Sequence, residues 1–399
     1  MIPSPTRRVV LAAAGAGWEA AAVRAVEAAP DLQLVRRCVD VAELIAVAQT
    51  GDVAVAAVDL SVPGLDVEAV RAVRAAGVRV VGLGPADRAS ALGADAVGAS
   101  DDVVSALRTV RLRPDDGPVA DEPPDRTGVA TEPPRAGLVV AVWGPQGAPG
   151  RSTVALALAD AMARAGRRCV LVDADTSGGA QAQQLGLLDE VSGLMAACRV
   201  ANQGHDEQVE DHLQVVRDGL AVLTGLPRPD MWVHVRAAPL ERVLRRLADT
   251  HDAVVVDVAA CLEAPDGPGG GRDQATVTAL QVADVVVVVG RADPVGLTRL
   301  VRGLHDLRDV VPDEPVVVLN QVRDSIGWSV EQLASTVHRL AGVRPLVALP
   351  QDGPTVDTAA LRGATLTEVD PRSALAASAQ TLATLVTRVR PVTLAAPTT

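Results

Sequence analysis

Short runs of aliphatic residues, uninterrupted by polar ones, recur along this 399-residue chain and alternate with stretches of helical periodicity. Several of these runs contain consecutive valines, which is typical of strands that are covered on both faces. Such strands occur in parallel sheets packed between helices, so the pattern predicts an α/β fold. The clearest runs, each predicted to be a strand, are 138–143, 169–173, 220–223, 253–257, 284–289, 315–319 and 345–349.

The first 112 residues show the same alternation on a smaller scale. About 110 residues of this pattern suit a five-stranded, flavodoxin-like unit. Strands are predicted at 9–13, 53–58 and 78–83, and helices at 18–28, 41–49 and 66–75.

The segment 113–135 separates these two parts of the chain. It contains six prolines and six acidic residues and almost no large apolar side chain. Such a composition buries too little apolar surface to fold, so we predict a disordered linker. We therefore expect two parallel-sheet domains, at 1–112 and 136–390, joined by this Pro-rich acidic linker, with 391–399 as a tail.

Composition narrows the possible partners and the cell compartment. The chain has no Phe, Tyr or Lys, and its 37 basic residues are all Arg, which indicates a GC-rich bacterial genome. The net charge of -12 disfavours general nucleic-acid binding. The absence of a signal peptide, of a membrane-spanning run and of metal-type cysteine spacing favours a cytoplasmic, reduced protein that meets a membrane at most peripherally.

The strongest local signal is the sequence Gly-Pro-Gln-Gly-Ala-Pro-Gly-Arg-Ser-Thr at 144–153, between a predicted strand and a predicted helix. Backbone N–H groups of such a loop, together with the helix dipole, form an anion site. Arg151 stands where a P-loop has its Lys, and Ser152 is a candidate Mg²⁺ ligand. An ordinary strand-to-helix turn is the alternative interpretation. The candidate nucleotide contacts here are Gly144, Gln146, Gly147, Gly150, Arg151, Ser152 and Thr153.

Carboxylates close two of the later predicted strands. Asp173 and Asp175 stand at the end of the run 169–173, and Asp257 ends the run 253–257. Carboxylates in these places bind Mg²⁺ or position an attacking water. The candidate catalytic residues are therefore Asp173, Asp175 and Arg151, and the candidate Mg²⁺ ligands are Ser152, Asp173 and Asp257.

With these motifs, residues 136–399 resemble the MinD/ParA family of deviant-Walker P-loop ATPases. The resemblance is closest to its CpaE-like (TadZ-like) pilus-assembly and septum-site-determining branch, in which a receiver-like domain precedes the ATPase. Further matches are the strand run ending at Asn320 and the sequence Leu-Pro-Gln-Asp at 349–352. The resemblance implies ATP and Mg²⁺ as cofactors, Asn320 on the adenine edge, and a base pocket lined by the loop 349–355 with Pro350.

The resemblance also implies a role and partners. The implied role is to organise a pilus, secretion or division machine in space. The implied partners are a second copy of the chain, in an ATP-dependent homodimer, and the protein components of that machine. The sequence departs from the family at Gln146, where the signature Lys is expected, and at Arg151. Because Gln carries no charge and Arg is a larger, planar group, we predict slow hydrolysis and weak nucleotide-dependent dimerisation. A non-hydrolysing nucleotide-bound scaffold and a ParA-type DNA-partition ATPase remain alternatives, and the acidic net charge disfavours the second.

The run ending at Asp59 resembles the phospho-acceptor strand of a response-regulator receiver. A working receiver also has an acidic pair after its first strand and a Lys near its fifth, and this chain has neither. We therefore predict a pseudo-receiver used for protein contacts, in which Asp59 is a turn residue. For the C-terminal helix at 373–389 we predict core packing, with membrane attachment as the alternative.

Overall fold

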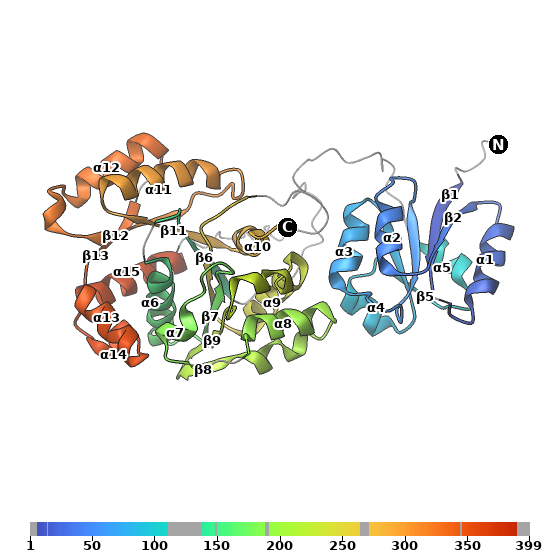
Figure 1. The fold of residues 1–399 in the computed structure, drawn as a ribbon, viewed down its shortest axis with the longest axis horizontal. Helices are drawn as coiled ribbons and strands as arrows, with labels where there is room; N and C mark the ends of the chain where they lie inside the picture. The colour runs from blue at the N-terminus through green and yellow to red at the C-terminus, as the bar shows by residue number, and fades with distance from the viewer. Residues whose placement is uncertain are drawn as a thin grey trace, which may run out of the picture. The chain divides into compact units, whose positions relative to one another are not determined.

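The computed structural model describes residues 6–13, 15–110, 137–147, 150–187, 191–263, 271–343 and 345–388. The chain forms two compact units, each built on a parallel sheet of its own (Figure 1). The predicted linker at 113–135 and the predicted tail at 391–399 lie outside the described residues. The α/β fold with two parallel-sheet domains is confirmed.

The first unit is a five-stranded sheet in the order β2-β1-β3-β4-β5, with every neighbouring pair parallel. This is the flavodoxin-like strand order. The edge strands β2 and β5 were not predicted individually, because β2 reads Leu-Gln-Leu-Val-Arg-Arg-Cys and β5 has three residues. The elements are β1 (Arg7–Ala12), α1 (Glu19–Ala28), β2 (Leu32–Cys38), α2 (Val41–Ala48), β3 (Val55–Asp59), α3 (Val67–Ala75), β4 (Arg79–Leu83), α4 (Ala86–Leu92), β5 (Ala96–Gly98) and α5 (Val103–Thr109).

Aspartates begin three of the helices in this unit. Asp40 accepts a hydrogen bond from the Glu43 amide at 2.8 Å, and Asp66 accepts one from the Ala69 amide at 2.8 Å. Asp102 caps α5 in the same way. Because these caps satisfy amides that the helix itself leaves unbonded, the local sequence sets where each helix starts.

The second unit is an eight-stranded sheet in the order β13-β12-β11-β6-β10-β7-β9-β8. Only the pair β8–β9 is antiparallel among the described strands. All seven predicted strands are present, and the short, partly polar edge strand β8 is the one not predicted. The strands are β6 (Leu138–Trp143), β7 (Cys169–Ala174), β8 (Gln214–Arg217), β9 (Leu220–Leu223), β10 (Ala253–Val258), β11 (Val285–Arg291), β12 (Val316–Val322) and β13 (Pro345–Pro350).

Helices pack against this sheet and bury an aliphatic core. Its members come from the strands and from α6 and α15, whose Leu375, Leu382 and Val386 are buried. The prediction that the C-terminal helix packs into the core is thus confirmed. The helices are α6 (Arg151–Arg164), α7 (Gln181–Gln184), α8 (Gly193–Asn202), α9 (Ala237–Thr250), α10 (Gln274–Val282), α11 (Pro294–Leu307), α12 (Val330–Ala341), α13 (Gly353–Arg362), α14 (Leu366–Val369) and α15 (Ala374–Arg388). Among the described residues, none of these helices is both long and apolar enough to cross a bilayer.

Strand order brings the acidic residues together. β6 lies between β11 and β10, and β7 lies on the other side of β10. The register pairs Asp257 with Asp173. Since parallel strands end at one edge of the sheet, the loop after β6 and the carboxylates of β7 and β10 meet there.

Candidate functional site

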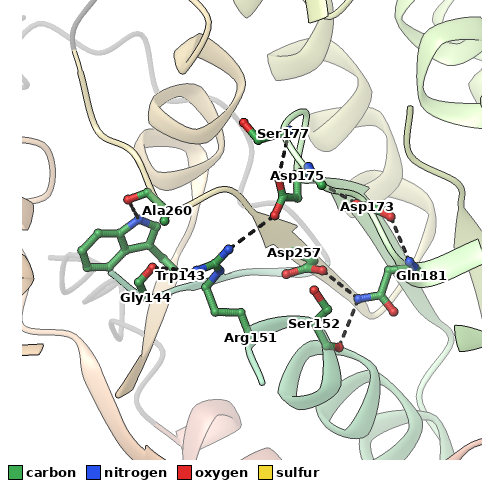
Figure 2. Close-up of polar contacts among 11 residues, drawn as sticks. Trp143, Gly144, Arg151, Ser152, Asp173, Asp175, Ser177, Gln181, Asp257 and Ala260 are labelled. Carbon is green, nitrogen blue, oxygen red and sulfur yellow. Dashed lines mark hydrogen bonds and ion pairs between the residues drawn. The ribbon is translucent and has the colours of Figure 1, made fainter. Parts of the chain in front are cut away.

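The glycine-rich loop connects β6 to α6 and begins after Trp143, whose indole donates to the Ala260 carbonyl at 3.2 Å (Figure 2). Gly147 and Gly150 have φ of 70° and 106°, a region that favours glycine. Gly150 is the N-cap of α6, and it has no side chain to cap the first turn. The amides at this helix start, together with the helix dipole, therefore favour an anion.

Three carboxylates lie next to this helix start. Asp173, Asp175 and Asp257 retain 1%, 6% and 0% of their accessible surface. Figure 2 shows them around Arg151 and Ser152, with the Ser152 hydroxyl beside Asp257. The structure thus assembles the predicted catalytic and metal-ligand candidates from three separate segments of the chain.

Asp173 and Asp257 differ in how their oxygens are bonded. Asp173 accepts backbone hydrogen bonds from Gln181 at 3.0 Å and from Asp175 at 3.3 Å. Oδ2 of Asp257 accepts from the Gln181 amide nitrogen Nε2 at 2.8 Å. Its Oδ1 is buried and has no hydrogen-bond partner among the described residues. Asp257 is thus an acceptor with unused capacity in a buried place.

Burial shapes the electrostatics of this pair. It raises the pKa of Asp173 well above the ordinary value, and the nearby Asp257 charge adds to the effect. Burial also raises the pKa of Asp257, and the nearby Ser152 hydroxyl, followed by the Gln181 hydrogen bond, opposes this increase. Two buried carboxylates without a cation are costly, so a bound cation would stabilise their charged forms.

Arg151 crosses from the helix start to the turn after β7. Its Nη1 donates to the Gly144 carbonyl at 3.2 Å, and its Nη2 lies 3.4 Å from Oδ2 of Asp175. The amides of Ser177 and Gly178 both donate to Oδ1 of Asp175 at 2.9 Å. Arg151 therefore holds the beginning of the loop and the Asp175 turn together.

Gln181, the first residue of α7, is a site residue that sequence analysis missed. Its side chain is fully buried, and besides Asp257 its Nε2 contacts the Ser152 carbonyl at 3.1 Å. A Gln eight positions after Asp173 carries no local pattern that would have indicated this role. The tertiary structure places the Gln181 side chain between β10 and α6, where it contacts Asp257 and Ser152.

A cavity of about 230 Å³ adjoins the far end of the loop. It is lined by Gly150, Thr153, Asn320 and Pro350, so the structure brings these four predicted residues together. The Asn320 amide lies against the loop, since a Cβ added to Gly150 would lie 2.2 Å from its Nδ2. The apolar part of the lining, which was not predicted from the sequence, includes Leu366, Leu375, Ala379 and Leu382.

Gln146 and Gly147 line a different cavity, of about 840 Å³. Its other lining residues include Trp143 and Pro145 from the loop side and Arg299 and Arg302 from α11, together with the acidic residues Glu263, Asp306 and Asp309. No lining residue is shared between the two cavities. The predicted nucleotide contacts are therefore divided between a Gly150 side and a Gly147 side of one loop.

Asp59, at the end of β3 in the first unit, is bonded on both oxygens. The Trp18 indole donates to Oδ2 at 2.9 Å, and the amide and hydroxyl of Ser61 donate to Oδ1 at 2.7 and 2.6 Å. Burial alone would raise the pKa of Asp59, but the hydrogen bonds from Ser61 and Trp18 together lower it. Both oxygens of Asp59 are thus already hydrogen-bonded by its own neighbours.

A parallel sheet whose central strand leads into a glycine-rich loop and a helix, with acidic strand ends beside it, is the arrangement found in P-loop folds. The C-terminal part of the chain shares its fold with solved members of the MinD/ParA ATPases. The cell division ATPase MinD of Pyrococcus furiosus is 20% identical, with a TM-score of 0.52, over 63% of this chain and 99% of that one.

Two further structures have the same fold. The ParA family ATPase from Chlorobium tepidum is 17% identical, with a TM-score of 0.53, over 62% of this chain and 99% of that one. The septum site-determining protein MinD from Pyrococcus horikoshii, in complex with Mg-ADP, is 20% identical, with a TM-score of 0.50, over 63% of this chain and 95% of that one. No protein-family model matches the chain, and no curated protein matches it. At these identities, the likeness establishes the MinD/ParA fold of the second unit.

Proposed function

We propose that the second unit binds ATP together with Mg²⁺. The observation that carries the proposal is the unpartnered Oδ1 of Asp257, buried beside Ser152 at a helix start that favours an anion. The cavity with Asn320 lies on the Gly150 side of the same loop and is mostly apolar, as a base pocket requires. The proposal thus gives phosphate, cation and base each a site beside this loop.

The donor set suits Mg²⁺. This cation prefers oxygen ligands, and carboxylate and hydroxyl oxygens are present on Asp257 and Ser152. Once a cation is bound, Asp173 would add negative charge at the same place, although backbone hydrogen bonds already use its oxygens. When bound, Mg²⁺ would neutralise phosphate charge. The residues of this chain would hold the cation at the helix start, and the cation would balance the charge of the two buried carboxylates.

Asp175 and Arg151 are the proposed catalytic pair, and their contact favours slow turnover. One oxygen of Asp175 accepts two turn amides, and the other lies against Arg151. Arg151 therefore competes with water for this carboxylate. This contact also supports the second candidate function, a scaffold whose nucleotide is held without hydrolysis, and phosphate-release kinetics separate the two.

The cellular role belongs to the same proposal. A MinD/ParA-like unit behind a pseudo-receiver fits a protein that organises a pilus or secretion machine, or septum placement, through protein contacts. We place it in the cytoplasm, at most peripherally at the inner membrane, as an ATP-dependent homodimer. The net charge of -12 disfavours the ParA-type DNA role.

Thermal unfolding tests ATP binding on the full chain. At a hundredfold excess over Kd, binding stabilises by about 2.7 kcal/mol. For a domain of this size that corresponds to a rise in Tm of about 5–10 °C. The control is ATP with EDTA in place of Mg²⁺, which should give a smaller rise. No rise with millimolar ATP and Mg²⁺ would refute the proposal.

A further inference from the structure

The guanidinium of Arg299, in the middle of α11, lies directly against the glycine-rich loop. A Cβ added to Gly147 would lie 1.8 Å from Nη1 and 2.9 Å from Cζ of Arg299, and all three of its nearest atoms belong to this side chain. The space that a side chain at position 147 would fill is therefore occupied by Arg299. The arginine is otherwise exposed and borders the cavity on the Gly147 side.

The packing of α11 explains how Arg299 reaches the loop. Gly303 follows one turn later on the same helix face. A Cβ there would lie 3.0 Å from Trp143 and 3.1 Å from Pro145. The absence of a side chain at Gly303 thus lets α11 approach the first half of the loop, and this approach carries Arg299 over Gly147.

The two cavities differ in character, and this difference suggests how a nucleotide would be oriented along the loop. Gly150 and Thr153 border the cavity that suits a base, whereas Gln146 and Gly147 border the one that contains Arg299. A nucleotide with its base beside Gly150 would extend its phosphates along the helix start and the loop. Its outermost phosphate would then face the Gly147 side.

A cation on that side would offset the charge of the outermost phosphate. Three carboxylates lie near the helix start, and the guanidinium of Arg151 is engaged with one of them, Asp175. A nucleoside triphosphate with one Mg²⁺ still carries about two negative charges, and charge-assisted hydrogen bonds to phosphate oxygens are short and strong. Gln146, which borders the same cavity, has no charge to offer.

We propose that Arg299 contacts the outermost phosphate of the bound nucleoside triphosphate and so distinguishes it from the diphosphate. The proposal rests on the proposed nucleotide-binding function. Arg299 would act from α11, a helix outside the loop, at a position that no local motif marks.

Competition binding of ATP and ADP with Mg²⁺ to the full chain tests this. Arg299→Ala is expected to weaken ATP about tenfold or more, as expected for a charge-assisted hydrogen bond, and to leave ADP unchanged. Arg299→Lys, which keeps the charge, should retain part of the preference. The matched control is Arg302→Ala, which removes an exposed arginine of the same helix and cavity and should change neither affinity. Tm without nucleotide checks that each variant is folded.

The outcomes separate the two proposals. If the wild-type chain binds neither nucleotide, the proposed function fails and this inference fails with it. If the wild-type chain binds both, but Arg299→Ala changes ATP and ADP equally or changes neither, only the role of Arg299 is overturned. An equal loss of ATP affinity in Arg302→Ala would likewise overturn it, since the cavity's general charge would then explain the effect.

Discussion

Asp59 and Asp257 both stand at the end of a parallel strand in an α/β sheet, yet their surroundings are opposite. Asp59 receives hydrogen bonds from Trp18 and Ser61 on its two oxygens. Asp257 is completely buried, receives one from Gln181, and keeps Oδ1 without a partner among the described residues. The same position in similar architecture is thus closed in one unit and open to a ligand in the other. An acidic strand end marks a site only when its neighbours leave it unsatisfied.

Asp257→Asn should give the largest effect in this comparison. It keeps the shape and an acceptor for Gln181 but removes the charge beside Ser152. We expect the rise in Tm with ATP and Mg²⁺, about 5–10 °C in the wild type, to be lost. Without nucleotide, Tm should stay the same or increase near neutral pH, because burial raises the pKa of Asp257 and its charged form therefore costs stability.

The matched control is Asp59→Asn, measured by the same differential scanning fluorimetry. This variant changes the carboxylate whose two oxygens are already hydrogen-bonded, and it should retain the full rise in Tm with ATP and Mg²⁺. A full rise in Asp257→Asn, or a loss in Asp59→Asn, would show that the open carboxylate is not the one that serves the nucleotide.

Asp175→Ala sharpens the comparison within the second unit. Asp175 is also bonded on both oxygens, but one of its contacts is the ion pair with Arg151, which a ligand can exchange. We expect any ATP turnover to decrease about tenfold or more, as for loss of a proton acceptor, while the Tm rise with ATP persists. Phosphate release measured with a coupled assay decides this. Unchanged turnover would remove Asp175 from the catalytic proposal.

Asp59→Asn should have a smaller effect on the first unit itself. It replaces a charged acceptor of three hydrogen bonds, and we expect a loss of about 1–2 kcal/mol of local stability at pH 7. Because the pKa of Asp59 is lowered, the stabilisation is present above the ordinary value of 3.8 and is lost as pH falls through the lowered pKa. Hydrogen exchange of peptides covering β3, compared between wild type and variant at pH 7 and below 4, measures both.

Asp52→Asn is the control for that experiment. Asp52 pairs with Arg8 at 3.4 Å with 60% of its side chain exposed, so its replacement should change exchange little. Equal protection of β3 in the Asp59→Asn and wild-type proteins at pH 7 would contradict the closed state of Asp59.

The smallest expected effect is on phosphorylation of Asp59. With Trp18 and Ser61 on its oxygens and no acidic pair after the first strand to bind Mg²⁺, the carboxylate is a poor phosphoryl acceptor. Incubation of the full chain with acetyl phosphate and Mg²⁺ should leave the intact mass unchanged. A stable mass increase located on Asp59 would show that this carboxylate is open to a ligand and would contradict the comparison.

Several features of this protein were predictable from the sequence by itself, because their causes are local. Runs of valine predict buried parallel strands. Asp59, Asp173 and Asp257 each stand at the end of such an apolar run, so their places at strand ends were also predictable. The glycine-rich loop is also local, since the φ values of Gly147 and Gly150 suit glycine. Edge strands such as β8 were missed, because a strand with one exposed side carries a mixed and weaker pattern.

Only the tertiary structure decided which of these groups are bonded to one another. Gln181 reaches Asp257 across 76 positions of sequence, and Trp18 reaches Asp59 across 41. Arg299 meets Gly147 because α11 packs on the loop at Gly303. Such contacts depend on strand order and on helix packing, and these are determined by the interactions of many residues together. The sequence therefore determined the elements and the chemical groups, and the fold decided which carboxylate stays open.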